Sequence, residues 1–184
     1  MTLLNDSFTN GIFGMLAQAV PAGPVTGWLF LGQLGVVLMM GMGALGSAIG
    51  TGAAGQAAAG AWGKEGKAGK TLRFTYIILV SAPITQTLYA MIVMNNLGKV
   101  LQNPTVAAAN AGLLLGIGIA TGLGEMLSAL FQGLVGAAGV RSLSESDGKG
   151  FAFILIALGI VETVGIFTMV FMLGMIPKLP GIIL

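Results

Sequence analysis

Four long apolar stretches constrain this chain more than any other feature of its sequence. They run over about residues 27–60, 72–97, 106–140 and 150–176. Each is long enough to cross a hydrocarbon layer of about 30 Å, which takes about 20 helical residues. Because lipid cannot hydrogen-bond the backbone, a spanning segment of this kind must be helical. We therefore predict an all-α membrane protein with four transmembrane helices.

The composition agrees with a membrane protein and excludes most enzyme chemistry. Charged residues make up 8% of the 184 residues and hydrophobic residues 55%, with a mean hydropathy of +0.95, whereas soluble domains carry about 25% charged residues. The chain has neither Cys nor His, so it lacks the thiol and imidazole groups of nucleophilic catalysis. A net charge of +2 is too small to indicate nucleic-acid binding.

The basic residues predict an orientation in the membrane. Six of the eight lie in or beside two connections, at Lys64, Lys67, Lys70, Arg73, Arg141 and Lys149. The positive-inside rule places those two loops in the cytoplasm. The N- and C-termini then lie on the non-cytoplasmic side, and the helices form two hairpins of parallel orientation.

This pattern divides the chain into five segments. They are an N-terminal segment at 1–26, a first hairpin at 27–97, a non-cytoplasmic connection at 98–105, a second hairpin at 106–176 and a C-terminal tail at 177–184. The N-terminal segment lacks a positively charged start and contains Asp6. We expect a surface or interfacial segment there rather than a cleaved signal peptide.

The two hairpins resemble copies of each other. "AAAGAW" at 57–62 and "GAAGVR" at 136–141 fall at the same place, near the cytoplasmic end of the leading helix. The two motifs are 79 residues apart, and the same offset aligns Glu162 with Pro83, so only the second copy carries the carboxylate.

The glycines of "GMGALGSAIGTGAAG" match a dinucleotide-binding pattern, but no strand precedes them. Gly46 and Gly50 instead predict an inner membrane helix that packs closely against copies of itself.

Three polar side chains lie at membrane depth. Glu162 follows Lys149, and Gln86 follows Arg73, by the same thirteen residues, which is about 20 Å along a helix. Gln132 precedes Arg141 by nine residues, about 14 Å from the same edge. A charge at that depth costs at least about 2.5 kcal/mol and is usually functional.

More oxygen atoms gather around these residues in "PITQTLYA". Thr85 and Tyr89 lie within one helical turn of Gln86, and Pro83 leaves the carbonyl of Leu79 without its helical partner. Carboxylate, amide, hydroxyl and carbonyl oxygens are the ligands that hard cations prefer. A proton needs only a carboxyl group and one partner. The additional oxygen atoms therefore favour Na⁺ over H⁺.

Taken together, these motifs resemble one family, the duplicated four-helix proteolipid of V-type and V/A-type rotary ATPases. The carrying motifs are "GSAIGTGAAGQAAAGA", "PITQTLY", "FQGLVGAAGV" and "IVETVGIF". The resemblance implies that the chain assembles into a homo-oligomeric rotor ring, with its first and third helices inside. It also implies a non-catalytic protein without a cofactor, which carries Na⁺ or H⁺ across the membrane.

The resemblance also implies roles for particular residues. Glu162 would carry the ion, and sodium-binding members place a Thr-Gln pair and a further Gln around it, here Thr85, Gln86 and Gln132. The backbone carbonyl before the proline would be that of Ala82. A tyrosine that hydrogen-bonds the glutamate would be Tyr89.

Partners follow from the same resemblance. A membrane stator protein would supply an arginine that displaces the ion, and central-stalk proteins would dock on the cytoplasmic loops. Two other interpretations stay open: a small ion-coupled secondary transporter that uses Glu162, and a structural channel or junction proteolipid.

Glu125 departs from this pattern. It precedes Gln132 by seven residues, hence on nearly the same helix face and about 10 Å farther from the cytoplasmic edge. Two roles are open for it: support of the ion site, or a protonated carboxyl at the ring interior, which we favour.

Overall fold

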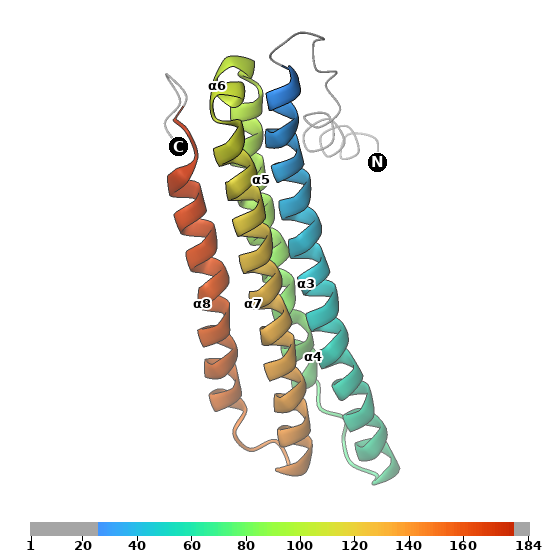
Figure 1. Cartoon of the computed structure of the whole chain (residues 1–184). Coiled ribbons are helices and arrows are strands. Elements are labelled where there is room, and N and C mark those ends of the chain that lie inside the picture. The colour runs from blue at the N-terminus through green and yellow to red at the C-terminus, as the bar shows by residue number, and fades with distance from the viewer. Residues whose placement is uncertain (1–25, 179–184) are drawn as a thin grey trace, which may run out of the picture.

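The computed structural model describes residues 26–178, and its regular structure in that range is helical (Figure 1). The expected surface segment, apart from residue 26, and residues 179–184 of the expected tail lie outside the described part. The helical elements are α3 (Thr26–Lys67), α4 (Thr75–Ser81), the 3₁₀ helix η2 (Ala82–Ile84), α5 (Thr85–Leu101), α6 (Pro104–Ala109), α7 (Ala111–Glu145) and α8 (Phe151–Met175).

Four helices in the described part are long and apolar enough to cross a membrane. They cover 28–67, 75–101, 111–145 and 151–175, the second of them being α4, η2 and α5 in succession. The chain is an integral, multi-pass membrane protein, and the predicted all-α fold with two hairpins is confirmed. Figure 1 shows the start of α3 and the end of α8 at the same end of the bundle.

The two leading helices extend beyond the apolar stretches from which they were predicted. Helix α3 continues to Lys67 rather than ending near residue 60, and α7 runs to Glu145 rather than ending near residue 140. Both are followed by a left-handed residue, Gly69 at φ 66° and Asp147 at φ 54°. Hydrogen bonds from Lys70 N to Glu65 O (2.9 Å) and from Gly148 N to Leu143 O (2.8 Å) close the last turns. This is the usual way in which the final carbonyls of a helix are satisfied.

Glycines bring α3 and α7 into backbone contact. A Cβ atom added at Gly46 would stand 2.5 Å from Met126 Cα, and one at Gly50 would stand 2.9 Å from the Pro83 side chain and closer to the Ala129 carbonyl. Gly133 in turn faces the backbone of Gly50. Close packing at Gly46 and Gly50 is therefore present, and its partner within one chain is α7, the leading helix of the second hairpin, whereas packing against copies of α3 stays a prediction.

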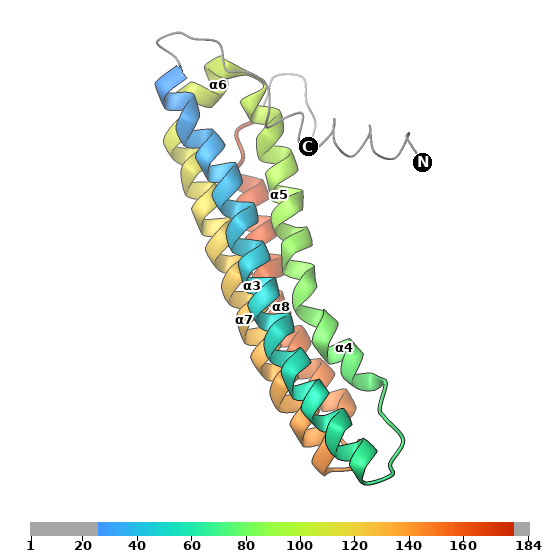
Figure 2. The ribbon, with the colours of Figure 1, turned by 90° about the vertical axis from the view of Figure 1, so that its right-hand side faces the viewer.

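Helices α5 and α8 pack against the pair formed by α3 and α7 (Figure 2). Among the residues of α8, only Leu158 and Gly165 are buried in the described chain. Its outer side carries large exposed apolar residues such as Phe153, Ile160 and Phe167. Helix α8 is therefore attached along one narrow side.

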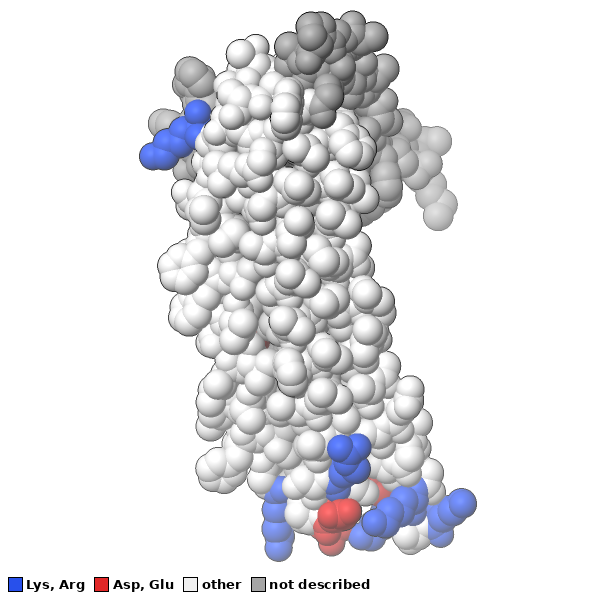
Figure 3. Space-filling view, viewed as in Figure 1, with Lys and Arg blue, Asp and Glu red and all other residues white. Residues whose placement is uncertain are grey.

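Charged residues gather at one end of the bundle, where α3 joins α4 and α7 joins α8 (Figure 3). There Arg73 is ion-paired with Glu65, which is 2% exposed, and with Asp147 of the other hairpin at 3.3 Å. Lys70 also pairs with Asp147, at 2.7 Å. These ion pairs connect the loop between α3 and α4 to the loop between α7 and α8.

The loop contacts shift the pKa values of the groups that make them. The hydrogen bond to Tyr76, together with the charge of Glu65, raises the pKa of Arg73. The hydrogen bond from Lys70, and then its charge, holds the pKa of Asp147 below its ordinary value. Both shifts favour the charged forms, so the inter-loop ion pairs persist at neutral pH.

Candidate functional site

Four polar side chains, three of them buried, meet where α5, α7 and α8 come together. Gln86 on α5 is 0% exposed, and Gln132 and Ser128 on α7 are 1% and 2% exposed. Glu162 on α8 is half-buried at the edge of this group. Buried polar groups need partners, and the contacts among these four provide them.

The amide of Gln86 is the centre of this group. Its Nε2 atom donates to Gln132 Oε1 at 2.9 Å and to Ser128 Oγ at 3.1 Å. Its Oε1 atom accepts from the hydroxyl of Thr85 at 3.2 Å. The hydrogen bond from Nε2 thus holds Gln86 in contact with Gln132, which lies 46 residues away in sequence, while Thr85 occupies the oxygen end of the Gln86 amide.

Two neutral donors hold the carboxylate of Glu162. The hydroxyl of Tyr89 donates to Oε1 at 2.8 Å, and Nε2 of Gln132 lies 3.4 Å from Oε2. Gln132 Nε2 also lies 3.4 Å from the carbonyl of Leu158 on the same helix as Glu162. The side chain of Glu162 is therefore oriented toward α5 and α7 rather than away from the bundle.

Pro83 shapes the helix next to this site. The backbone passes through the 3₁₀ helix η2 at Ala82–Ile84 before α5 begins at Thr85, because proline lacks the N–H that the α-helical pattern requires. Thr85 Oγ1 lies 3.1 Å from the Ala82 carbonyl oxygen as well as near Gln86. The carbonyl of Ala82 and the hydroxyl of Thr85 are thus brought to the same group of polar side chains.

One hydrogen-bonded chain therefore contains all six residues that the sequence analysis assigned to an ion site. It runs from the Ala82 carbonyl through Thr85, Gln86 and Gln132 to Glu162, and Tyr89 joins it there. We call this set the polar cluster. Its members are Ala82, Thr85, Gln86, Tyr89, Gln132 and Glu162.

Ser128 is a further polar residue at this site, and the sequence analysis missed it. Its hydroxyl accepts from Gln86 and donates to the Val161 carbonyl at 3.1 Å, next to Glu162. A usable signal is present in the sequence, because Ser128 precedes Gln132 by four residues and so lies on the same face of α7. The signal is weak, since a serine in a membrane helix commonly bonds only to its own helix.

Glu125 lies inside the same chain, outside the polar cluster. It is 0% exposed, and neither carboxylate oxygen has a hydrogen-bond partner among the described residues. A Cβ atom added at Gly165 of α8 would stand 2.7 Å from its Oε2 atom, so the carboxyl group packs against the glycine one turn after Glu162. The hydroxyl of Thr121, one turn earlier on α7, is likewise buried without a partner in this part of the chain.

The oxygen atoms of the polar cluster determine which kind of ion it could bind. Within residues 26–178, no group of three or more His, Cys, Asp or Glu side chains converges in a way that could hold a metal ion. The site instead combines a single carboxylate with amide, hydroxyl and carbonyl oxygens. Such a set suits a hard cation of low charge or a proton, and not a transition metal.

Comparison with known proteins identifies one family. The family model that describes the C subunit of ATP synthase matches the chain twice, over residues 34–95 and over residues 115–175, which together make up more than half of its length. Each match covers one hairpin, so the predicted duplication is confirmed. No curated protein matches the chain.

Proposed function

Because the chain belongs to the family of ATP synthase C subunits, rotor proteolipids that carry ions, we propose that it is the sodium-binding rotor proteolipid of a V-type or V/A-type ATPase. As a duplicated member it is a non-catalytic, ion-translocating protein that forms a ring within the rotary complex. This assignment favours the rotor over the secondary transporter and the structural channel considered from the sequence.

The observation that carries the sodium assignment is the number of oxygen atoms in the polar cluster, the hydrogen-bonded group that includes Glu162. We assign the Glu162 carboxylate, the Gln132 and Gln86 side-chain oxygens, the Thr85 hydroxyl and the Ala82 carbonyl as ligands of Na⁺. Tyr89 closes the site by its 2.8 Å hydrogen bond to the carboxylate. A proton would use only the carboxylate, and it is the alternative cargo where Na⁺ is scarce.

The V-type assignment is supported by the placement of the carboxylate. The chain has two hairpins, and the second carries Glu162 where the first carries Pro83. A duplicated proteolipid with one carboxylate carries one ion for every four helices. This is the feature in which the motifs resemble V-type and V/A-type proteolipids.

The proposed mechanism is charge neutralisation. Bound Na⁺ neutralises Glu162, so the ring can rotate past lipid without exposing a charge. An arginine of a membrane stator protein displaces the ion at the aqueous half-channels. Nucleotide chemistry takes place in soluble partner proteins, which connect to the ring through a central stalk.

The charged end of the bundle is assigned to the cytoplasm. Lys64, Lys67, Lys70 and Arg73 lie in or beside one loop, and Arg141 and Lys149 lie in or beside the other, in agreement with the positive-inside rule. Both chain termini then lie on the non-cytoplasmic side. The cytoplasmic segments at 64–70 and 142–149 are the expected docking surface of the central stalk.

The test is modification of Glu162 by dicyclohexylcarbodiimide, followed by mass spectrometry of the purified ring. We expect Na⁺ to slow the modification, and this protection to weaken at low pH as protons compete with Na⁺. Glu162→Gln should abolish the modification at this position. Modification that depends on pH but not on Na⁺ would leave a rotor proteolipid and contradict the sodium assignment.

Gln86→Leu tests the ligand assignment separately from the carboxylate. Removal of the amide oxygen should abolish the Na⁺ protection while Glu162 still reacts in a pH-dependent way. Gln102→Leu is the matched control, because Gln102 caps the end of α5 and lies far along the helix from the cluster. Equal protection in both variants would remove Gln86 from the proposed ligand set.

A further inference from the structure

Ser128 of α7 lies between the Gln86 amide and the backbone of α8. Its hydroxyl accepts a hydrogen bond from Gln86 Nε2 at 3.1 Å and donates one to the Val161 carbonyl, also at 3.1 Å. Because a carbonyl can only accept, the single proton of the Ser128 hydroxyl is used for Val161. The hydroxyl oxygen is then left as an acceptor, and only the Nε2 end of the Gln86 amide fits opposite it.

Gln132 faces the same end of the Gln86 amide. Its Oε1 atom accepts from Gln86 Nε2 at 2.9 Å, while its own Nε2 atom lies 3.4 Å from the Glu162 carboxylate and 3.4 Å from the Leu158 carbonyl. Both of those groups are acceptors, so Gln132 also presents its oxygen to Gln86. If the Gln86 amide turned over, its Oε1 atom would stand opposite two oxygen atoms, those of Gln132 and Ser128.

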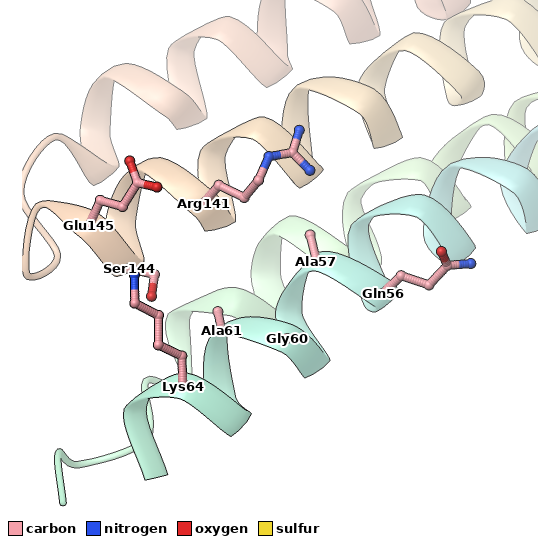
Figure 4. Close-up of a pocket in the computed structure, with 8 residues that line it drawn as sticks. All are labelled: Gln56, Ala57, Gly60, Ala61, Lys64, Arg141, Ser144 and Glu145. Carbon is pink, nitrogen blue, oxygen red and sulfur yellow. The ribbon is translucent and has the colours of Figure 1, made fainter. Parts of the chain in front are cut away.

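Solvent does not reach this amide. Gln86, Gln132 and Ser128 are 0%, 1% and 2% exposed within a single chain, and further copies in a ring do not uncover a group that one chain already buries. The pocket of about 300 Å³ at the charged end of the bundle is lined on α7 from Arg141 onward (Figure 4), which is about 14 Å along the helix from Gln132. Protein groups therefore determine the orientation of the Gln86 amide.

We propose that Ser128 is a positioning residue that makes the site selective for Na⁺ over H⁺, because it holds the Gln86 amide with its oxygen atom toward the ion. This inference rests on the proposed sodium site and deepens it. With Nε2 held by Ser128, the Oε1 atom faces the hydroxyl of Thr85, another proposed ligand, at 3.2 Å. A turned amide would present N–H groups there, which repel a cation. A proton on Glu162 would be unaffected, since it needs no amide oxygen.

Ser128 differs from Gln132 because its contacts do not depend on the cargo. Gln132 is itself a proposed ligand and contacts the carboxylate of Glu162, so its partners would change during the proposed transport cycle. Ser128 is anchored to a backbone carbonyl of α8 instead. Gly165 permits this contact, because even a Cβ atom added there would stand 3.2 Å from Ser128 Oγ. Ser128 therefore holds the amide in one orientation whether the site is loaded or empty.

The test compares Na⁺ protection of Glu162 from dicyclohexylcarbodiimide in wild-type and Ser128→Ala rings. We expect the Na⁺ concentration for half protection to rise at least about threefold in Ser128→Ala, which corresponds to the roughly 0.6 kcal/mol of one hydrogen bond within a membrane. Modification without Na⁺ should keep its pH dependence, because the contacts of Glu162 with Tyr89 and Gln132 remain. A general loss of packing around the site would change both readouts.

Thr121→Val is the matched control. It removes a buried hydroxyl from the same helix, and that hydroxyl has no hydrogen-bond partner in the described part of the chain. Ser128→Thr retains the hydroxyl at the site and should be protected at the wild-type Na⁺ concentration.

The possible outcomes separate this inference from the proposed function. An unchanged Na⁺ concentration in Ser128→Ala, or an equal rise in Thr121→Val, would overturn the positioning role. Equal weakening in Ser128→Ala and Ser128→Thr would assign the effect to packing against α8 and overturn it as well. Absence of Na⁺ protection in the wild-type ring would contradict the sodium assignment itself, and the inference with it. The wild-type ring thus tests the proposed function, and the variants test Ser128.

Discussion

Glu125 and Gln132 provide a paired test of what a buried polar group contributes in this bundle. They lie on the same side of α7 and are 0% and 1% exposed. Gln132 takes part in three hydrogen bonds, to Gln86, Leu158 and Glu162, whereas both oxygens of Glu125 are without a partner in the described chain. Replacement of each by methionine, which is flexible and similar in length, should therefore change stability in opposite directions.

The magnitudes follow from the partners of each residue. Glu125→Met removes a buried group that is not hydrogen-bonded, which costs about 1–3 kcal/mol, so the variant should be more stable by about that amount. Gln132→Met loses three hydrogen bonds at about 0.6 kcal/mol each within a membrane, and should be less stable by about 2 kcal/mol. The assay is unfolding of the protein in mixed micelles by titration with sodium dodecyl sulfate, followed by circular dichroism.

The result that would refute this reasoning is a clear loss of stability in Glu125→Met. It would mean that the carboxyl group has a partner in the assembled protein that a single chain does not provide. Glu125→Gln extends the test to function, because it keeps the shape of the side chain. We expect Na⁺ protection of Glu162 to survive in Glu125→Gln, and its outright loss would assign Glu125 to the support of the ion site.

Three other outcomes follow from contacts described above. Gly50→Ala should destabilise the chain by about 1–3 kcal/mol through overpacking. Gly60→Ala should not, because a Cβ atom added at Gly60 would have no neighbour within 4 Å. Equal effects of the two substitutions in the micelle assay would contradict the packing of α3 on α7. Tyr89→Phe removes the 2.8 Å hydrogen bond to Glu162 and should speed carbodiimide modification severalfold, and an unchanged rate would deny Tyr89 its closing role. Asp147 has a pKa below its ordinary value of 3.8, so its stabilising effect is complete above about pH 5 and is lost as pH falls through the folded-state pKa. Asp147→Asn should therefore lower the unfolding midpoint at pH 6, and this effect should shrink as pH falls below the ordinary value of 3.8; a difference that does not shrink would exclude the ion pairs as its cause.

Most of the fold could be predicted from the sequence because hydropathy alone identifies membrane helices. Helix ends were less accurate, since α3 and α7 continue past their apolar segments to Lys67 and Glu145. Both helices end just before a left-handed residue, Gly69 or Asp147. An aspartate, unlike a glycine, does not by itself predict a helix end. Alignment of the two hairpins could have predicted the end of α7, because Asp147 stands nearly where the first hairpin has Gly69.

The polar cluster was predictable for a different reason. Polar residues are rare in membrane helices and costly there, so Gln86, Gln132 and Glu162 stand out by type and depth. Ser128 does not stand out, and its role depends on the approach of α8, which brings the Val161 carbonyl within 3.1 Å. The lack of a partner for Glu125 within the described chain could not be predicted either, because it depends on which groups the neighbouring helices place opposite it.

The partners of Glu162 affect coupling in the proposed rotor. Tyr89 and Gln132 are neutral donors, and no basic side chain in the described part of the chain forms an ion pair with Glu162. Hydrogen bonds orient an ionised carboxylate but do not cancel its charge, so an empty site stays costly in lipid. In the proposed mechanism, only cargo or a stator arginine would then neutralise Glu162. Rotation without an ion would therefore be opposed by the protein itself, and each step of the ring would be tied to the transport of one ion per protomer.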